Sequence, residues 1–289
     1  MTDGSLVLVF DDGYVEDHDQ LRPVLRSHDA PATLAVVPDW IGDNDHLDPG
    51  QLGDLVDAGC EVLAHGRRHR YLQSHHLAAD AAAGDERIVV EAGHVFPGEG
   101  HGTLAGDEYE LVGTGYTVRV TLTGTGAADG ETVAVEISGE LDESVAGDTA
   151  ILRPAGPTLL DEIVGVREGF ETLGYDPSTF VFPYDAADAR AWRLAREEYD
   201  AVANSAVRSL PNPPGTEPTN FRRYYLETTH SRPPEIETYL DHIAASGGVG
   251  ILAGHSAWDS VPPERVAFVI EAARERDVEV TTFDALADT

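Results

Sequence analysis

The stretch Leu6-Val7-Leu8-Val9-Phe10-Asp11-Asp12-Gly13 decides the fold. Its first five residues form an unbroken apolar run, which is typical of a strand buried on both faces of a parallel sheet. Helix and strand patterns then alternate along the chain. The sequence predicts a helix over 17–28, a strand over 32–37, a helix over 49–58 and a strand over 60–64. This alternation indicates parallel βα units and hence an α/β sheet or barrel.

The pattern changes after about residue 85. Apolar and polar residues alternate over 118–122 and 133–137, a period of two that is typical of half-exposed antiparallel strands. Short strands are predicted at 87–90, 110–112, 116–122, 132–137 and 149–152. We therefore predict a barrel formed by residues 1–85 plus 155–289, and a small all-β insertion over 86–154.

The α/β alternation resumes from Pro157. The sequence predicts helices over 159–173, 187–198, 234–246 and 263–276. Strands are predicted over 179–182, 201–203, 223–226, 248–253 and 278–282. The second part of the chain therefore supplies the remaining strands of the same parallel sheet or barrel.

The charge balance is strongly acidic. Lysine plus arginine number 19 and aspartate plus glutamate number 52, which gives a formal net charge of −33. Such a surface repels phosphate groups, because neutralising them needs clustered cations. The composition therefore argues against nucleic acids and anionic lipid surfaces as partners.

The chain has one cysteine, Cys60, so no disulfide can form within it. The N-terminal residues lack a basic segment, and the apolar run at 6–10 is too short to span a membrane. These features predict a cytoplasmic protein without a membrane span.

All 19 basic residues are arginine and none is lysine. A lysine-free chain rich in Asp, Glu, Ala, Gly and Val resembles the proteins of extreme halophiles with G+C-rich genomes. Near-molar salt shortens the Debye length to about 3 Å and so mutes repulsion between surface carboxylates. The alternative is an acidic mesophilic protein whose arginine content reflects codon bias.

If the halophile interpretation is right, the protein loses its structure at low salt, because its surface carboxylates then repel one another over a longer range. Thermal unfolding in molar salt and in dilute buffer measures this. A melting temperature that is the same in both would remove the interpretation.

Three polar clusters come directly after predicted strands. They are Asp11-Asp12-Gly13, His65-Gly66-Arg67-Arg68-His69 and Gly254-His255-Ser256. Because the carboxyl ends of parallel strands lie on one face of a sheet or barrel, we expect these clusters to converge. Each cluster alone has an ordinary explanation, as a turn or a buried histidine; their joint occurrence at strand ends favours a site.

The residue types suggest a metal site with a separate base. Two histidines four residues apart can point the same way, and with one carboxylate they form a set that suits Zn²⁺ with an open coordination position. In an Asp-Asp pair, one carboxylate can bind the ion while its neighbour stays available as a base.

These clusters resemble the motifs of the polysaccharide deacetylases of the NodB-homology type (carbohydrate esterase family 4). The first motif corresponds to residues 9–13, the second to 65–69, the third to 180–185 and the late histidine motif to 252–255. The resemblance covers the chain except for residues 86–154. It implies a distorted (β/α)7-type barrel with that segment as a β insertion.

The resemblance also implies residue roles. Asp12, His65 and His69 would hold a divalent metal, most often Zn²⁺, and Asp11 would be the catalytic base. The backbone N–H of Tyr184 would help to bind the oxyanion, and His255 would be the acid.

The chain departs from the family pattern in several places. Val181 stands where the third motif often has an arginine that orients the base, and Arg222 or Arg223 is the candidate substitute. Gly66 replaces a serine or threonine, and Asp185 replaces a glycine. No fourth motif is visible.

The implied activity is removal of acetyl groups from N-acetylated amino sugars in an oligosaccharide, a glycan or a glycolipid precursor. Two alternatives stay open: another C–N hydrolase, such as a sugar deformylase or a ring-opening amidase, and a catalytically silent carbohydrate-binding relative. The 86–154 insertion could line a sugar groove, act as a lid, mediate a homo-oligomer through an open strand edge, or add stability only.

Overall fold

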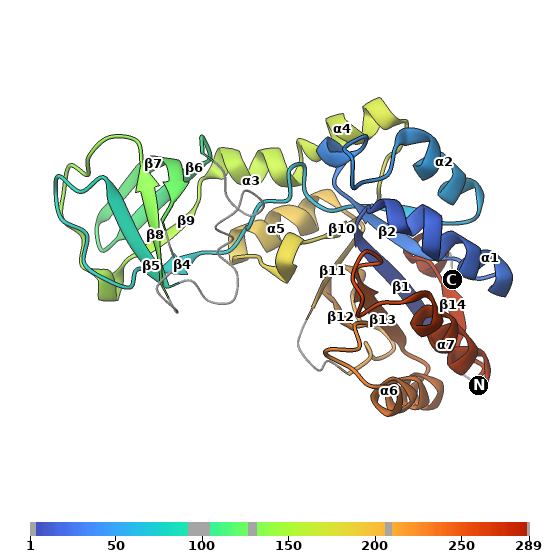
Figure 1. Ribbon diagram of the computed structural model, residues 1–289. Helices are drawn as coiled ribbons and strands as arrows, with labels where there is room; N and C mark the ends of the chain where they lie inside the picture. Colours follow the sequence, from blue (N-terminus) through green and yellow to red (C-terminus); the bar gives the residue numbers. More distant parts are fainter. Residues whose placement is uncertain (1–3, 92–104, 127–131, 206–209, 288–289) are drawn as a thin grey trace. The chain divides into compact units, whose positions relative to one another are not determined.

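The computed structural model describes residues 4–91, 105–126, 132–205 and 210–287 (Figure 1). The chain forms two compact units. Unit 1 comprises Met1–Gly66, Arg167–Val181 and Tyr199–Thr289, and unit 2 comprises Arg67–Val166 and Phe182–Glu198. The predicted boundaries of the insertion, 86 and 154, are not tested by this division and stay a prediction.

Unit 1 contains a closed parallel barrel of seven strands, which confirms the predicted fold. The strands are β1 (Ser5–Asp12), β2 (Thr33–Val36), β3 (Glu61–Ala64), β10 (Thr179–Val181), β11 (Ala201–Ser205), β12 (Phe221–Tyr225) and β13 (Val249–Gly254). They pair in the order β13-β12-β11-β10-β3-β2-β1, and β13 pairs back to β1 to close the ring. All of these pairings are parallel.

The barrel is distorted at β1. Strand β13 pairs with β1 along Ser5–Phe10. An eighth strand, β14 (Glu279–Thr281), pairs with Ser5–Val7, whereas β2 pairs with Val9–Asp12. Because β1 is surrounded by three strands, its apolar residues are fully buried, as the unbroken apolar run predicts.

The helices of unit 1 lie around the barrel in Figure 1. They are α1 (Arg22–His28), preceded by a π-helical turn, η1 (Asp17–Leu21), then α2 (Pro49–Asp57), α4 (Val166–Leu173), α6 (Pro233–Ser246), α7 (Pro263–Arg274) and α8 (Phe283–Ala287). Two short 3₁₀ helices, η2 (Pro38–Trp40) and η5 (Pro218–Asn220), complete the unit. Helix α2 begins where its sequence predicts, because the Asp48 carboxylate accepts hydrogen bonds from the N–H groups of Gly50 and Gln51.

The prediction of one helix over 159–173 was wrong. The segment forms two helices, α3 (Gly156–Ile163) and α4 (Val166–Leu173). The N–H groups of Val164 and Gly165 both donate to the carbonyl of Leu160, which ends α3. Glycine has a low helix propensity, and a Cβ at position 165 would lie 2.8 Å from the Asp161 carbonyl oxygen, so only glycine fits this break.

Unit 2 contains an antiparallel sheet. Its strands are β4 (His75–His76), β5 (Arg87–Glu91), β6 (Glu108–Gly113), β7 (Tyr116–Thr125), β8 (Thr132–Ile137) and β9 (Ile151–Pro154). They pair in the order β4-β9-β6-β7-β8-β5, and a bridge between Leu77 and Val90 links the two ends. The apolar side chains of alternating residues form a separate core inside this sheet.

Unit 2 also contains η3 (Gly147–Thr149), α3, η4 (Pro183–Asp185) and α5 (Ala189–Glu198). In the described part of the chain, no helix is long and apolar enough to cross a membrane.

Candidate metal and catalytic site

The Asp-Asp pair lies at the carboxyl end of β1. Asp11 and Asp12 are its last two residues, and each is 5% exposed. Asp12 and Gly13 both have positive φ, 79° and 73°. A left-handed conformation is unfavourable for a residue with a side chain, and such strain occurs often at functional sites. The two carboxylates have different partners: Asp11 contacts Arg223, and Asp12 lies near His65 and His255.

The three polar clusters supply neighbouring groups within unit 1, as predicted. His65 follows β3, and its Nε2 lies 3.4 Å from Asp12 Oδ1. His255 follows β13, and its Nε2 lies 3.7 Å from Asp12 Oδ2. Parallel pairing explains this, because all three strands end on the same side of the barrel.

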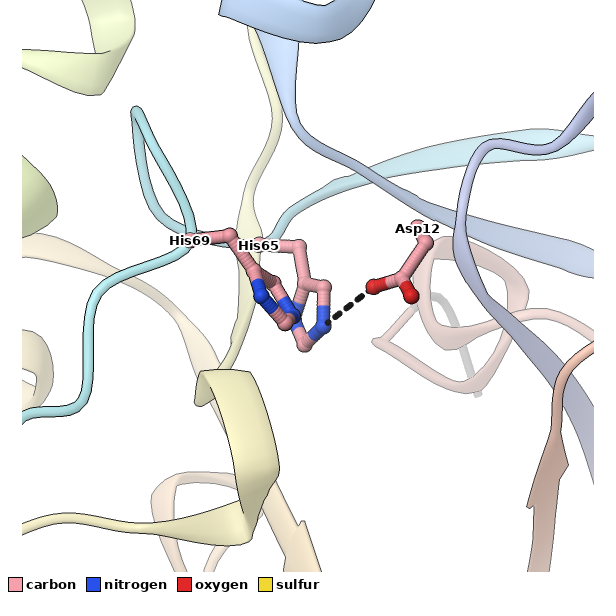
Figure 2. Close-up of side chains that lie close together, drawn as sticks. All are labelled: Asp12, His65 and His69. Atoms are coloured by element: carbon pink, nitrogen blue, oxygen red, sulfur yellow. Dashed lines mark ion pairs between the residues drawn. The ribbon is translucent and has the colours of Figure 1, made fainter. Parts of the chain in front are cut away.

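Asp12, His65 and His69 form the candidate metal site (Figure 2). Each offers one ligand atom, all three atoms lie within 4.8 Å of one another, and all three residues are buried. In Figure 2 a dashed line marks the ion pair between His65 and Asp12. Two imidazoles and one carboxylate are a donor set that suits Zn²⁺ and similar divalent ions. The side chains that are present therefore fit the metal that the resemblance implies.

The orientation of His65 supports this fit. Its Nδ1 lies 2.8 Å from the carbonyl oxygen of Val181. A carbonyl only accepts hydrogen bonds, so Nδ1 carries the proton and Nε2 presents its lone pair toward Asp12. Histidine ligands are commonly held by such a second hydrogen bond. Val181 stands at the position of the family's arginine, and its backbone carbonyl helps to orient the His65 imidazole.

Arg223, one of the two candidate substitutes for the third-motif arginine, contacts Asp11. Its Nη1 donates to Asp11 Oδ1 at 2.8 Å and to Oδ2 at 2.9 Å, and the Arg223 side chain is 2% exposed. Of the two candidate substitutes, Arg222 is exposed and Arg223 makes the contact. Burial alone would raise the pKa of Asp11, but the guanidinium, with His65 and His255, lowers it below its ordinary value. Asp11 therefore stays ionised, as a base must.

Replacing Arg223 with methionine should lower the free energy of unfolding at pH 8 by about 3–5 kcal/mol, because a buried carboxylate loses its partner. The pKa of Asp11 in the folded state, which Arg223 lowers in the wild type, should rise in the variant. Wild-type Asp11 stabilises the fold above its unfolded pKa and loses this contribution as the pH falls through the native pKa. The variant should instead regain stability as the carboxyl takes up a proton. Denaturant unfolding of metal-free protein at pH 4.5 and 8 measures this, with the exposed Arg222→Met as control; equal effects of the two substitutions would contradict it.

Glu227, which sequence reasoning missed, orients His255. Its Oε1 lies 3.2 Å from His255 Nδ1, and the Glu227 side chain is 3% exposed. Burial lowers the pKa of His255, but Glu227, Asp12 and Asp11 together raise it above its ordinary value. Trp258, 46% exposed, stacks on the imidazole with ring centroids 3.7 Å apart. His255 is therefore held in a form that can carry and donate a proton.

Asp17, at the start of η1, is a further buried acid in unit 1 and is fully inaccessible. Burial raises the pKa of Asp17 to about 7, and the charge of Asp12 adds to this, while Ser256 opposes it. Asp17 therefore favours its protonated form below about pH 7.

An Asp17→Asn variant should be more stable than the wild type at pH 8, by on the order of 2–4 kcal/mol. The pKa of Asp17 is higher in the folded state than in the unfolded state. Its stabilising contribution to the fold is therefore fully present below about pH 3.8 and is lost as the pH rises through about 7. Unfolding of metal-free protein at pH 4.5 and 8 measures this. The exposed Asp19→Asn controls for the lost charge; a difference between wild type and Asp17→Asn that does not change with pH would refute it.

Tyr184 lies in unit 2, in η4, and its ring packs against the imidazole of His69 with centroids 4.5 Å apart. Tyr184 and Asp185 have positive φ, 57° and 53°. Asp185 occupies the position where the family has glycine, and aspartate is among the few residues that tolerate this conformation. The departure therefore preserves the turn.

Comparison with known proteins gives an independent result for the N-terminal part of the chain. Residues 1–88 match the family model described as polysaccharide deacetylase. The predicted family resemblance is confirmed. The matched segment contains Asp11, Asp12, His65 and His69. A search of the curated proteins found no match.

Several solved structures share the fold. A structure of "T48 deacetylase with substrate" is 16% identical, with a TM-score of 0.51, and the match covers 100% of this chain and 93% of that one. A family 4 carbohydrate esterase from Streptomyces lividans in complex with acetate is 12% identical, with a TM-score of 0.52 and coverage of 98% and 94%. A family 4 pseudoenzyme from Bacillus anthracis is 10% identical, with a TM-score of 0.51 and coverage of 99% and 66%. These likenesses establish the fold, which active and inactive proteins share.

Proposed function

We propose that this protein is a metal-dependent hydrolase that removes acetyl groups from N-acetylated amino sugars. The observation that carries the proposal is the buried set of Asp12, His65 and His69 beside two oriented pairs, Asp11 with Arg223 and His255 with Glu227. An inactive relative has no need to keep a base and an acid, each held by its own buried partner.

An acetamide is a poor electrophile and neutral water is a poor nucleophile. A divalent ion held by Asp12, His65 and His69 would supply Lewis-acid polarisation and a more acidic water. Asp11, kept ionised by Arg223, would take the proton from the attacking water. The backbone N–H of Tyr184 would stabilise the developing oxyanion, a contribution of about 10²–10³-fold in rate.

His255 would complete the reaction by protonating the departing amine, without which the C–N bond does not break productively. Its raised pKa suits this role, because it favours the protonated imidazole. Trp258 is an exposed aromatic surface directly against this acid and suits stacking on a sugar ring.

The experiment pairs metal analysis after dialysis with acetate release from N-acetylglucosamine oligomers at high salt. Bound divalent metal together with acetate release is the expected result. Metal without acetate would favour another C–N hydrolase, such as a sugar deformylase or a ring-opening amidase. Neither metal nor acetate would favour a silent carbohydrate-binding relative.

A further inference from the structure

The loop that carries His69 is held in an unfavourable conformation. His69 has a φ of 58°, in the left-handed region, where a residue with a side chain costs on the order of 1–3 kcal/mol. Such a conformation persists only when surrounding groups impose it. Within unit 2, the groups that do so are identifiable.

A buried carboxylate accepts hydrogen bonds from the backbone on both sides of His69. Glu162, in α3, has a side chain that is 0% exposed. Its Oε2 accepts from the N–H of Arg68 at 3.0 Å and from the N–H of Arg70 at 3.4 Å. Its Oε1 accepts from Arg68 Nε at 3.0 Å. Backbone N–H groups that converge on one anion in this way form a concave anion site, filled here by the protein's own carboxylate.

The side chain of Arg70 also constrains the backbone next to His69. Its Nη1 donates to the carbonyl oxygen of Arg68 at 2.9 Å, and its Nε lies 2.9 Å from Asp107 Oδ2. The Arg68 carbonyl belongs to the peptide plane before His69, and the Arg70 N–H belongs to the plane after it. Since both planes are held, the φ and ψ of His69 are fixed by Glu162 and by the pair formed by Arg70 and Asp107.

We propose that Glu162 is a positioning residue for the metal site, which acts through the backbone to hold His69 in its ligand orientation. This inference rests on the proposed metal site. The geometry attributes this positioning to the Glu162 carboxylate, which extends far enough to accept hydrogen bonds from two backbone N–H groups. Asp107, next to β6 in the β-rich segment, assists by pairing with Arg70. Loss of a group that orients a metal ligand typically lowers metal affinity by about 10–100-fold.

The test measures Zn²⁺ affinity by competition with a chromophoric chelator in two variants that separate reach from charge. Glu162→Asp keeps the charge but withdraws the oxygens by one methylene, so Zn²⁺ should bind about 10–100-fold more weakly. Glu162→Gln keeps an oxygen at full reach without the charge, so most of the affinity should return. The visible spectrum of bound Co²⁺ reports the same ligand geometry without turnover.

The matched control is Asp161→Asn. Asp161 is the neighbouring acid, and its oxygens contact the side chains of Arg67 and Arg68, each at 2.9 Å. It should bind Zn²⁺ like the wild type. Circular dichroism checks that each variant is folded. Wild-type affinity in folded Glu162→Asp, or weaker binding in Glu162→Gln than in Glu162→Asp, would overturn the inference alone; a wild-type protein that binds no divalent metal would overturn the proposed metal site with it.

Discussion

Replacing Asp11 with asparagine should reduce acetate release by about 10²–10⁴-fold, the range that a positioned base contributes. Asparagine has the same shape, and its side-chain oxygen can still accept from Arg223, so the fold should be kept. Its amide cannot take a proton from water. Because Asp12, and not Asp11, belongs to the metal set, bound metal should remain at the wild-type level.

Initial rates of acetate release and metal content, measured on the same samples, check this result. Asp54→Asn is the matched control. Asp54 is an exposed residue of α2 with no assigned catalytic role, and its replacement removes the same charge. Near-full activity in Asp11→Asn would withdraw the assignment of the base. Loss of metal together with activity would instead move Asp11 into the ligand set.

The sequence predicted the barrel because burial leaves a direct signature. Strand β1 is surrounded on both edges and both faces, so Leu6–Phe10 had to be apolar without interruption. The polar residues after it then had to lie at the carboxyl end of the strand. The same rule located His65 and His255, which is why three distant clusters could be assigned to one side of the barrel.

The partners of the catalytic residues were harder to predict. Arg223 and Glu227 lie in and just after β12, and neither sits in a pattern that differs from ordinary strand and loop residues. Arg223 was a candidate only because the third motif lacks its arginine. Glu227 had no such signal: what identifies it is burial beside His255, and burial of a charged loop residue is a tertiary property.

Local exceptions escaped prediction for a similar reason. The apolar spacing over 159–173 continues through the break at Gly165, because α3 and α4 each bury a stripe of the same period. The two-residue strand β4 is too short to show any alternation. In the second-motif loop, the spacing of His65 and His69 suggested a shared ligand role, but only the structure shows that His69 is left-handed and that Glu162 holds its backbone.

Removing the His69 imidazole should have the second large effect. His69→Ala deletes one of three protein ligands, so divalent metal should bind more than about 100-fold more weakly, beyond the range seen when only a supporting group is lost. Acetate release should fall to background at metal concentrations that saturate the wild type. Unlike Asp11→Asn, this variant should regain part of its activity when excess Zn²⁺ is added, because its base and acid are intact.

His76→Ala is the matched control, because His76 is an exposed histidine of β4 in the same unit. Titration with Zn²⁺, followed by both chelator competition and acetate release, separates the two losses. If the site works as proposed, the two curves shift together to higher metal concentration. A His69→Ala protein that keeps wild-type affinity would show that Asp12 and His65 bind the ion without it. The ligand set would then have to be redrawn, with His255, whose Nε2 lies 3.7 Å from Asp12 Oδ2, as a candidate ligand.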